Sequence, residues 1–344
     1  MPKTAALHRA ARSRDIERVK LLLRSGEGAR AMRLIGDRWS LLILGDAFLG
    51  VRRFEDLLRR TGATRGTLAA RLSALVDHGI LYRNPIAETP KRFEYRLTEK
   101  GLGFYPVALT LWIWEGRWSD AADLPPSLIH VKCGQKLTPL QVCGNCQEPI
   151  DRHDVIFEAG PGERYYGSAA HATRRRGPGT RRLAAGIDRT LFHAVDTFGD
   201  RWSVLLLATL YLGLHRYDDI NAAIGIATNI LADRLRHFLA AGIVEQHLYR
   251  ERPVRYEYRL TQKGWDLFSF TVALHDWARR WIPSPRGPAL ILRHRPGRHL
   301  LTTKMICAEC RQELDPHEVA LKPGARRRPA RRATSKGTHA ARAR

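Results

Sequence analysis

The sequence contains no apolar stretch long enough to cross a lipid bilayer. Its longest apolar run extends from Val204 to Leu214, between Arg201 and His215, whereas a transmembrane helix needs about 20 apolar residues. No signal-peptide pattern opens the chain either. We therefore expect a cytoplasmic protein that acts away from membranes.

Motifs of common hydrolases and nucleotide-binding enzymes are also missing. There is no glycine-rich phosphate loop ending in lysine, no His-Glu-x-x-His metal motif and no Gly-x-Ser-x-Gly nucleophile turn. We expect no catalytic activity.

Acidic residues are scarce, and two segments lack them altogether. The chain carries 58 Lys and Arg against 34 Asp and Glu, a formal net charge of +24. Residues 171–182 contain five arginines and residues 326–344 contain eight cations, without an acid in either segment. Such segments cannot bury a core, so we expect a flexible linker and a disordered tail that follow DNA phosphates without sequence preference. Double-stranded DNA is the expected partner.

One stretch of sequence occurs twice, with a constant offset of 163 residues. Gly36 to Ser40 reads Gly-Asp-Arg-Trp-Ser, and Gly199 to Ser203 repeats it. The same offset relates further pairs, among them Gly79 and Gly242, Tyr95 and Tyr258, and Trp118 and Trp281. A register kept from Gly36 to Trp118 indicates duplication of one folding unit.

Each copy has the pattern of three helices, a hairpin and a further helix. In the first copy, apolar spacing and terminal glycines predict helices over 39–49, 54–60 and 64–78. Alternating residues predict strands over 80–83 and 92–97. A last helix over 100–118 is apolar on most sides, which indicates association between copies or chains, or burial within its own domain. This is the winged helix-turn-helix plan, a mainly α fold with small β-hairpin wings (α+β).

The repeated residues resemble a known family. Gly-Asp-Arg-Trp-Ser-Leu-Leu-Ile-Leu at 36–44 and Arg-x-Glu-Tyr-x-Leu-Thr at 92–98 and 255–261 are similar to the HxlR-type transcriptional regulators. The resemblance implies a non-catalytic winged helix-turn-helix that binds palindromic operators as a homodimer, and a repressor rather than an activator. This chain departs from that pattern because one polypeptide could supply both halves, so a homodimer and an intrachain pseudo-dimer both stay open. The redox-sensing cysteine of some members is missing, since residues 25–29 contain none.

The third helices of the two copies have unequal outer faces. Placing the apolar residues inward leaves mainly Gly, Ala and Ser outside in the first copy, whereas the second exposes Asn229, Asp233, Arg236 and His237. Asn can read adenine, Asp can accept from cytosine and Arg favours guanine. We therefore expect the second copy to supply most base specificity and the first to contact phosphates and thymine methyls.

The candidate DNA-binding residues lie on these helices and on the wings. They are Arg65, Thr67, Arg71, Lys91 and Arg92 in the first copy, and Thr228, Asn229, Asp233, Arg234, Arg236, His237, Arg252 and Arg255 in the second. Three alternatives stay open. Asp233 could pair with a neighbouring arginine, the recurrence of Arg71 as Arg234 could reflect folding, and the wing tips could be merely solvated.

A segment with metal-ligand residues follows each copy. The first supplies His130, Cys133, Cys143 and Cys146, a set that suits tetrahedral zinc. The second, offset by 164, keeps His294, Cys307 and Cys310 but has Gly297 in place of Cys133, so His317 or His299 would have to complete it. We expect structural zinc within each segment, with His317 as the fourth ligand of the second. Reduced, metal-free cysteines are the alternative.

These features divide the chain into seven parts. They are an N-terminal helical extension (1–25), a first winged-helix domain (26–120), a Cys-containing segment resembling a zinc ribbon (121–162), a basic linker (163–186), a second winged-helix domain (187–283), a degenerate Cys-containing segment (284–324) and a basic tail (325–344). Residues 7–26 are similar to one ankyrin repeat, but an amphipathic helix docked on the first domain fits them better. Two further functions stay open, a sequence-indifferent nucleoid-type protein and a protein-interaction scaffold.

Overall fold

The computed structural model describes residues 15–86, 93–119, 127–162 and 192–322. The basic linker expected at 163–186 and the tail expected at 325–344 lie outside these residues, as do residues 1–14. Within the described ranges, no helix combines the length and the apolar character that a bilayer span requires.

The first module, residues 38–118, has the expected order of helices and strands. Its elements are α3 (Arg38–Phe48), α4 (Phe54–Thr61), α5 (Arg65–Asp77), β1 (Leu81–Pro85), β2 (Phe93–Leu97), α6 (Glu99–Leu102) and α7 (Tyr105–Trp118). β1 and β2 form an antiparallel wing with Leu81 opposite Leu97.

The second module, residues 201–281, repeats this order. Its elements are α9 (Arg201–Tyr211), α10 (Tyr217–Ile224), α11 (Thr228–Ala240), β6 (Val244–Glu251), β7 (Val254–Leu260), α12 (Gln262–Trp265) and α13 (Phe268–Trp281). The tandem winged-helix fold predicted from the repeat is thus confirmed, as a mainly helical architecture with small antiparallel strand pairs.

The repeated Gly-Asp-Arg-Trp-Ser motif is a helix start. The carboxylate of Asp37 accepts hydrogen bonds from the backbone N–H groups of Trp39 and Ser40, and Asp200 does the same at the start of α9. These bonds satisfy N–H groups that the first turn of a helix leaves without partners. The motif therefore recurs because both modules begin their central helix in the same way.

The single helix predicted over 100–118 is two helices. α6 ends at Leu102, and α7 begins at Tyr105 with Pro106 in its first turn. Proline has no N–H to donate and is tolerated in the first turn of a helix, but it breaks a helix interior. Pro106 therefore fits the start of α7, but the equivalent break between α12 and α13, with Ser269 in place of the proline, shows that proline is not what causes it.

α7 and α13 pack against each other and join the modules into one core. The indole N–H of Trp114 donates to the carbonyl of Lys263 (3.0 Å), and that of Trp277 donates to the carbonyl of Lys100 (3.0 Å). These two bonds are equivalent under the repeat offset, so the modules face each other across a pseudo-twofold axis. The apolar surface predicted for the last helix of each copy thus serves association between the two copies.

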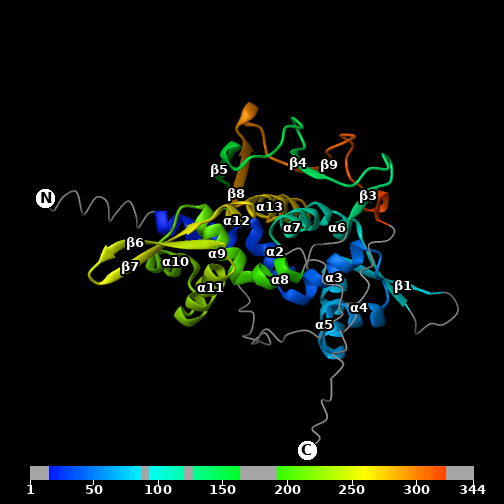
Figure 1. Cartoon of the computed structure of the whole chain (residues 1–344), viewed down its shortest axis with the longest axis horizontal. Coiled ribbons are helices and arrows are strands. Elements are labelled where there is room, and N and C mark those ends of the chain that lie inside the picture. Colours follow the sequence, from blue (N-terminus) through cyan, green and yellow to red (C-terminus); the bar gives the residue numbers. More distant parts are fainter. Residues whose placement is uncertain (1–14, 87–92, 120–126, 163–191, 323–344) are drawn as a thin grey trace, which may run out of the picture.

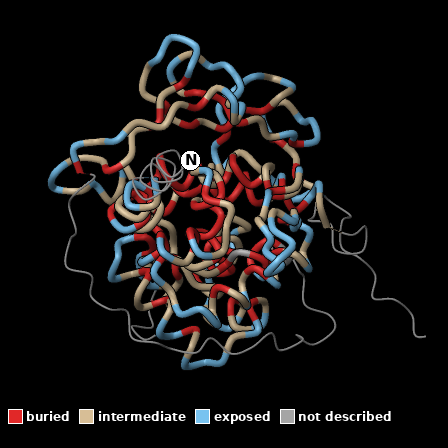
Figure 2. Tube along the Cα trace, turned by 90° about the vertical axis from the view of Figure 1, so that its left-hand side faces the viewer, coloured by how far each residue is buried: buried red, intermediate tan, exposed pale blue. Residues whose placement is uncertain are grey.

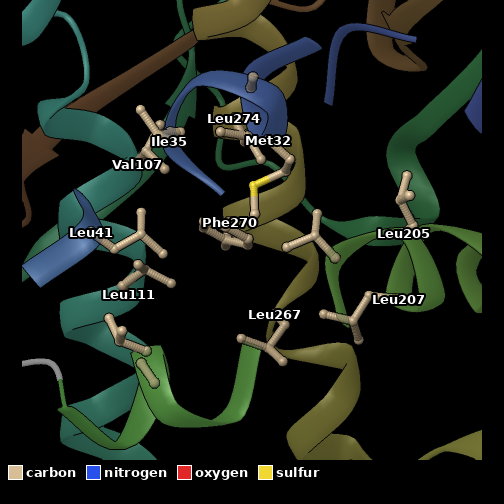
Figure 3. Packing of buried hydrophobic residues seen from close by; sticks show 14 of the residues in the cluster. Met32, Ile35, Leu41, Val107, Leu111, Leu205, Leu207, Leu267, Phe270 and Leu274 are labelled. Carbon is tan, nitrogen blue, oxygen red and sulfur yellow. The ribbon is translucent and has the colours of Figure 1, made fainter. Parts of the chain in front are cut away.

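The helices that precede the modules cross over to the opposite module. α2 (Glu27–Ile35) packs chiefly against α13 and α9 of the second module, whereas its counterpart α8 (Phe192–Phe198) packs against α3 and α7 of the first module as well as against α9 of its own. In Figure 3, Met32 and Ile35 of α2 lie near Leu274 of α13 in the shared core. Figure 2 shows that the buried parts of the chain, in red, gather toward the centre of the molecule.

The N-terminal helix lies against the second module instead of the first, on which the sequence predicted it; the guanidinium of Arg24 lies beside Gly225, which ends α10. Residues 15–25 are helical, with Val19, Leu22 and Leu23 buried. In α2, which follows the N-terminal helix, Arg30 donates to the carbonyl of Ile282 at 3.0 Å. The buried carboxylate of Glu27 accepts from two backbone N–H groups, at residues 289 and 290. An amphipathic helix buries its apolar face wherever the fold provides a surface, and here that surface belongs largely to the second module.

The two Cys segments pair with each other instead of folding separately. The first, residues 128–159, contains β3 (Leu128–His130), β4 (Pro139–Cys143), η1 (Arg152–Asp154) and β5 (Val155–Ala159); the second, residues 290–321, contains β8 (Leu290–His294), η2 (Pro296–Arg298), β9 (Thr303–Cys307), η3 (Pro316–Glu318) and β10 (Val319–Leu321). β3 pairs with β10, β4 with β9 and β5 with β8, all antiparallel. These strands form a layer over α7 and α13, at the top of Figure 1.

Candidate nucleic-acid interface and metal clusters

The third helices of the modules, α5 and α11, lie on one side of the molecule. Figure 1 shows both at the lower side, opposite the strands of the Cys segments, with one wing at each end of the long axis. A winged-helix protein needs a third helix that is free to enter a DNA groove, and this chain has two such helices on the same side.

The outer face of α5 carries few polar side chains. Leu68, Leu72 and Leu75 are buried as predicted, while Gly66 and Ala70 are exposed. Thr67 is half-buried, and its backbone N–H and hydroxyl both contact the capping hydroxyl of Thr64.

Arg65, at the start of α5, is exposed and forms an ion pair with Glu55 at 2.9 Å. Exposed pairs of this kind contribute only about 0–1 kcal/mol, so a phosphate can replace Glu55 as the partner of Arg65.

The outer face of α11 is rich in hydrogen-bonding groups. Thr228, Asn229, Asp233 and Arg236 are exposed, whereas His237 is half-buried and its Nε2 atom is shielded from solvent, so only its Nδ1 atom could reach DNA. Asp233 pairs with Arg236 at 3.4 Å, the neighbouring arginine that the sequence offered as an alternative partner. Because both groups are exposed, the pair is weak and leaves both able to meet a base edge.

Arg71 and Arg234 have the same partner in both modules. Arg71 lies 3.2 Å from the capping carboxylate of Asp37, and Arg234 lies 3.3 Å from that of Asp200. Each arginine thus ties the third helix to the start of the central helix. A role in folding is therefore enough to explain why the arginine occurs in both modules. The guanidinium groups are partly exposed, so they can still contact a phosphate.

The wings carry further cations. Arg252 and Arg255 are exposed on the second wing, where Arg255 pairs with Asp218 at 3.2 Å. Arg250 is a third exposed cation on this wing that the sequence analysis missed, although its alternation with Arg252 could have indicated it. Lys91 and Arg92 of the first wing lie outside the described residues.

The Cys and His side chains form two clusters, each drawn from both Cys segments. In the first cluster, His130 and Cys133 meet Cys307 and Cys310. The Nδ1 atom of His130 lies 3.3 Å from the Sγ atom of Cys133 and 3.4 Å from that of Cys310, and the Sγ atoms of Cys133 and Cys307 are 4.0 Å apart.

The second cluster contains Cys143, Cys146, His294 and His299. The Sγ atom of Cys143 lies 3.2 Å from Nε2 of His299, and the Sγ atom of Cys146 lies 3.2 Å from Nδ1 of His294. In both clusters the four donor atoms lie within 4.8 Å of one another. Either cluster could hold a metal ion.

The grouping expected from the sequence differs from this arrangement. His130 and Cys133 do not meet Cys143 and Cys146, because β3 and β4 pair with strands of the other segment. His317 is exposed in η3 and belongs to neither cluster. His299, the other candidate for the position left by Gly297, completes the second cluster.

The pKa values of these side chains are shifted in both directions: burial and the neighbouring cysteines raise the pKa of Cys133 and Cys146, whereas Cys307 and His294 are shifted toward the forms that bind metals. The pKa of the Cys307 thiol is lowered; burial opposes this shift, but the backbone N–H groups of Cys310 and Glu309 stabilise the thiolate. Burial also lowers the pKa of His294, which favours the neutral imidazole. Thiolate and neutral imidazole are the forms that coordinate metals.

Three known proteins are each similar to a part of this chain. Rv3095 of Mycobacterium tuberculosis, an uncharacterized HTH-type transcriptional regulator, is 42% identical over 134 residues, which is 39% of this chain and 85% of the relative. YvaP of Bacillus subtilis, another uncharacterized HTH-type transcriptional regulator, is 36% identical over 90 residues, 26% of this chain and 83% of the relative. The solved structure of PA1607, described as a candidate transcription factor, shares 37% identity, covers 37% of this chain and 89% of its own, and gives a TM-score of 0.33.

The family of these modules follows from two matches within the chain. The family described as HxlR-like helix-turn-helix matches residues 34–123 and again residues 197–286. Together the two matches cover more than half of the 344 residues. The chain therefore belongs to the HxlR-like helix-turn-helix family of DNA-binding transcriptional regulators, with two copies of the family's domain in one polypeptide.

Proposed function

We propose that the chain is a sequence-specific DNA-binding regulator in which two unequal modules act as the halves of a pseudo-dimer. One observation carries the proposal: α5 and α11 lie on the same side of a single shared core (Figure 1). A dimeric helix-turn-helix protein presents two such helices to successive turns of the major groove. Here one polypeptide holds both helices.

Base recognition is assigned mainly to the second module. Asn229, Asp233, Arg236 and His237 offer donors and acceptors that fit base edges, whereas the matching face of α5 offers chiefly glycine and alanine. Phosphate contacts are assigned to the remaining candidates, Arg65, Thr67, Arg71, Lys91, Arg92, Thr228, Arg234, Arg252 and Arg255. Phosphate contacts set position and base contacts set sequence preference.

Protection of a defined site tests this function. We expect the full chain to protect one short region of a DNA fragment selected for binding, in the presence of a large excess of unrelated DNA. A steep dependence of DNA affinity on salt is expected of any basic DNA-binding protein. Protection that survives excess unrelated DNA is therefore what distinguishes sequence-specific from nonspecific binding. Protection that disappears with the competitor would favour a nucleoid-type function, for which the acid-free segments 171–182 and 326–344 would suffice.

A pair of variants tests the inequality of the modules. We expect Asn229→Ala to reduce discrimination between selected and scrambled sites by about 1–3 kcal/mol, the value of one good base contact. Thr67→Ala should weaken binding to both DNAs alike, because it removes no base-reading group. Equal loss of discrimination in the two variants would contradict unequal modules.

We propose repression as the mode of action, because a rigid protein with two recognition helices can block a promoter simply by occupying it. Its place of action would be the cytoplasm, at the nucleoid, where a regulator meets chromosomal DNA. The cofactor we propose is structural zinc, since thiolates and imidazoles are its preferred ligands and four protein ligands leave no open coordination position.

A further inference from the structure

We propose that two zinc ions join the Cys segments, each ion held by ligands from both of them. One ion would bind His130, Cys133, Cys307 and Cys310, and the other Cys143, Cys146, His294 and His299. The inference extends the structural zinc proposed above and does not depend on DNA recognition.

Strand pairing delivers the ligands in these combinations. In the β4–β9 ladder, Cys143 lies opposite Thr303 and Cys307 opposite Pro139, so the first cysteine of each Cys-x-x-Cys pair occupies an opposite end of the same ladder. β3 and β8 end at His130 and His294. Each end of the layer therefore receives a histidine from one segment and a Cys-x-x-Cys pair from the other.

The separations between donor atoms fit a tetrahedral zinc ion. Bond lengths near 2.3 Å to sulfur and 2.0–2.1 Å to nitrogen place tetrahedral ligands roughly 3.5–3.8 Å apart. The distances given above between neighbouring donors run from 3.2 to 4.0 Å. Since all four donor atoms of each cluster lie within 4.8 Å of one another, shifts of at most about 1 Å would complete either site.

The backbone of each cluster forms the tight turns that hold paired ligands. The N–H of Gln147 donates to the carbonyl of Cys143 and that of Arg311 to the carbonyl of Cys307, both at 2.8 Å. Gln147 and Arg311 have φ of 62° and 61°. Residues other than glycine pay roughly 1–2 kcal/mol in this left-handed region, and a metal bound by the adjoining cysteines would stabilise both turns.

The difference between the two segments also argues for metal binding. Gly297 replaces the cysteine that corresponds to Cys133, which would leave three ligands in the second cluster. His299 lies two residues further on and brings its Nε2 atom to 3.2 Å from Cys143. One ligand is missing from the repeat pattern and another stands in its place, so each cluster retains four donors.

Zinc content of the full-length chain is the first measurement. We expect about two zinc ions per chain after purification without added metal. A wild-type chain without measurable zinc, also after incubation with zinc and removal of the excess, would overturn the proposal. DNA binding is not part of this readout, so failure here and failure of the regulator function are distinguishable.

Two double variants reveal which ligands share an ion. In Cys133→Ser with Cys307→Ser, both substitutions fall in one cluster, so we expect one zinc ion per chain to remain. In Cys133→Ser with Cys143→Ser, each cluster loses one ligand, and we expect both ions to be lost to a chelator concentration that leaves the wild type fully loaded. Ligation within each segment gives the reverse order, and that result would overturn the shared sites.

Two single histidine variants identify the fourth ligand of the second ion. His299→Ala should release one zinc ion to the chelator, whereas the exposed His317→Ala should retain both. Ligation within the second segment through His317 would require the opposite result. Far-ultraviolet circular dichroism of each variant, compared with the wild type, identifies any variant that has lost its fold.

Discussion

Trp118 and Trp281 occupy equivalent positions at the ends of α7 and α13, but their surroundings differ. The indole N–H of Trp118 donates to Asp266 at 2.9 Å. The position equivalent to Asp266 in the first module is Gly103, and the indole nitrogen of Trp281 has no hydrogen-bond partner among the described residues. At this pair of tryptophans the pseudo-twofold symmetry is therefore broken by a single difference, Asp266 against Gly103.

This difference can be measured with matched substitutions. We expect Trp118→Phe to lower the free energy of unfolding by about 1 kcal/mol more than Trp281→Phe, because only the first removes a hydrogen bond. The reduction in ring size is common to both. Urea unfolding of the two variants gives the comparison, and equal losses would show that the Trp118 hydrogen bond contributes no net stability.

His275 connects stability to pH. It is buried in α13, with Glu27 of α2 3.7 Å away and Asp276, Arg279 and Arg30 nearby. Burial lowers its pKa from the ordinary 6.5, although the two acids act in the other direction. As the pH falls below about 6.5, the unfolded chain binds a proton that the folded chain refuses, so the free energy of unfolding should decrease.

The measurement is urea unfolding at pH 7, 6 and 5. We expect the wild type to lose stability over this range more steeply than His275→Gln, which has no proton to bind. His215 and His294 also have lowered pKa values, so the wild type as a whole reflects several groups. Equal losses of unfolding free energy in the wild type and the variant would contradict this prediction and would show that Glu27 stabilises the protonated ring of His275.

Sequence reasoning located single residues better than their partners. The repeat identified Arg71 and Arg234 as equivalent, but not their ion pairs with Asp37 and Asp200. The alternative of a folding role was open, because a side chain on a helix flank can turn either way. The ion pairs show a contact that supports folding, and the contact of these arginines with DNA stays a prediction.

At the scale of elements, the two third helices begin differently. Thr64 caps α5 by accepting from the N–H of Thr67, whereas Ala227, at the same position before α11, has no side-chain oxygen. We expect Thr64→Ala to cost about 1 kcal/mol of stability and Ala227→Thr to add a few tenths or more. Thermal unfolding of both variants checks this, and stabilisation by Thr64→Ala would refute the capping role.

The helices of the modules were predictable because their signals are local. Apolar spacing and the glycines at 50, 62 and 79 are visible within one stretch of chain, and all three glycines have positive φ. The strands of the Cys segments are different, because each pairs with a strand that lies more than a hundred residues away. Their short lengths carry no periodic pattern, so the mixed ligand sets could not be read from spacing.

At the scale of the molecule, the Cys segments brace the two modules. The Nε2 group of Gln141 donates to the carbonyl of Ser269 in α13, and the N–H of Thr303 donates to Asp276. Apolar residues of α7 and α13 continue into the cores of both segments. Metal ions that join the segments would thereby help to fix α5 relative to α11.

Removal of metal tests whether the strands of the Cys segments help to align the two DNA-facing helices, α5 and α11. We expect a chelator to lower affinity for a selected site several-fold while binding to scrambled DNA changes little, since phosphate attraction depends on charge and less on the alignment of the helices. Binding to the two DNAs before and after chelation, and again after zinc is restored, gives the answer. Equal loss on both DNAs would point to general unfolding.

The central claim is that one chain with two unequal modules reads an asymmetric site. Selection of binding sequences from random DNA by the full-length chain, with the number of chains per site measured on the selected DNA, tests it most directly. We expect one chain per site and two half-sites about 10 base pairs apart, centre to centre, with base preference concentrated in one half. A palindrome with equally strong halves, bound by two chains, would contradict it.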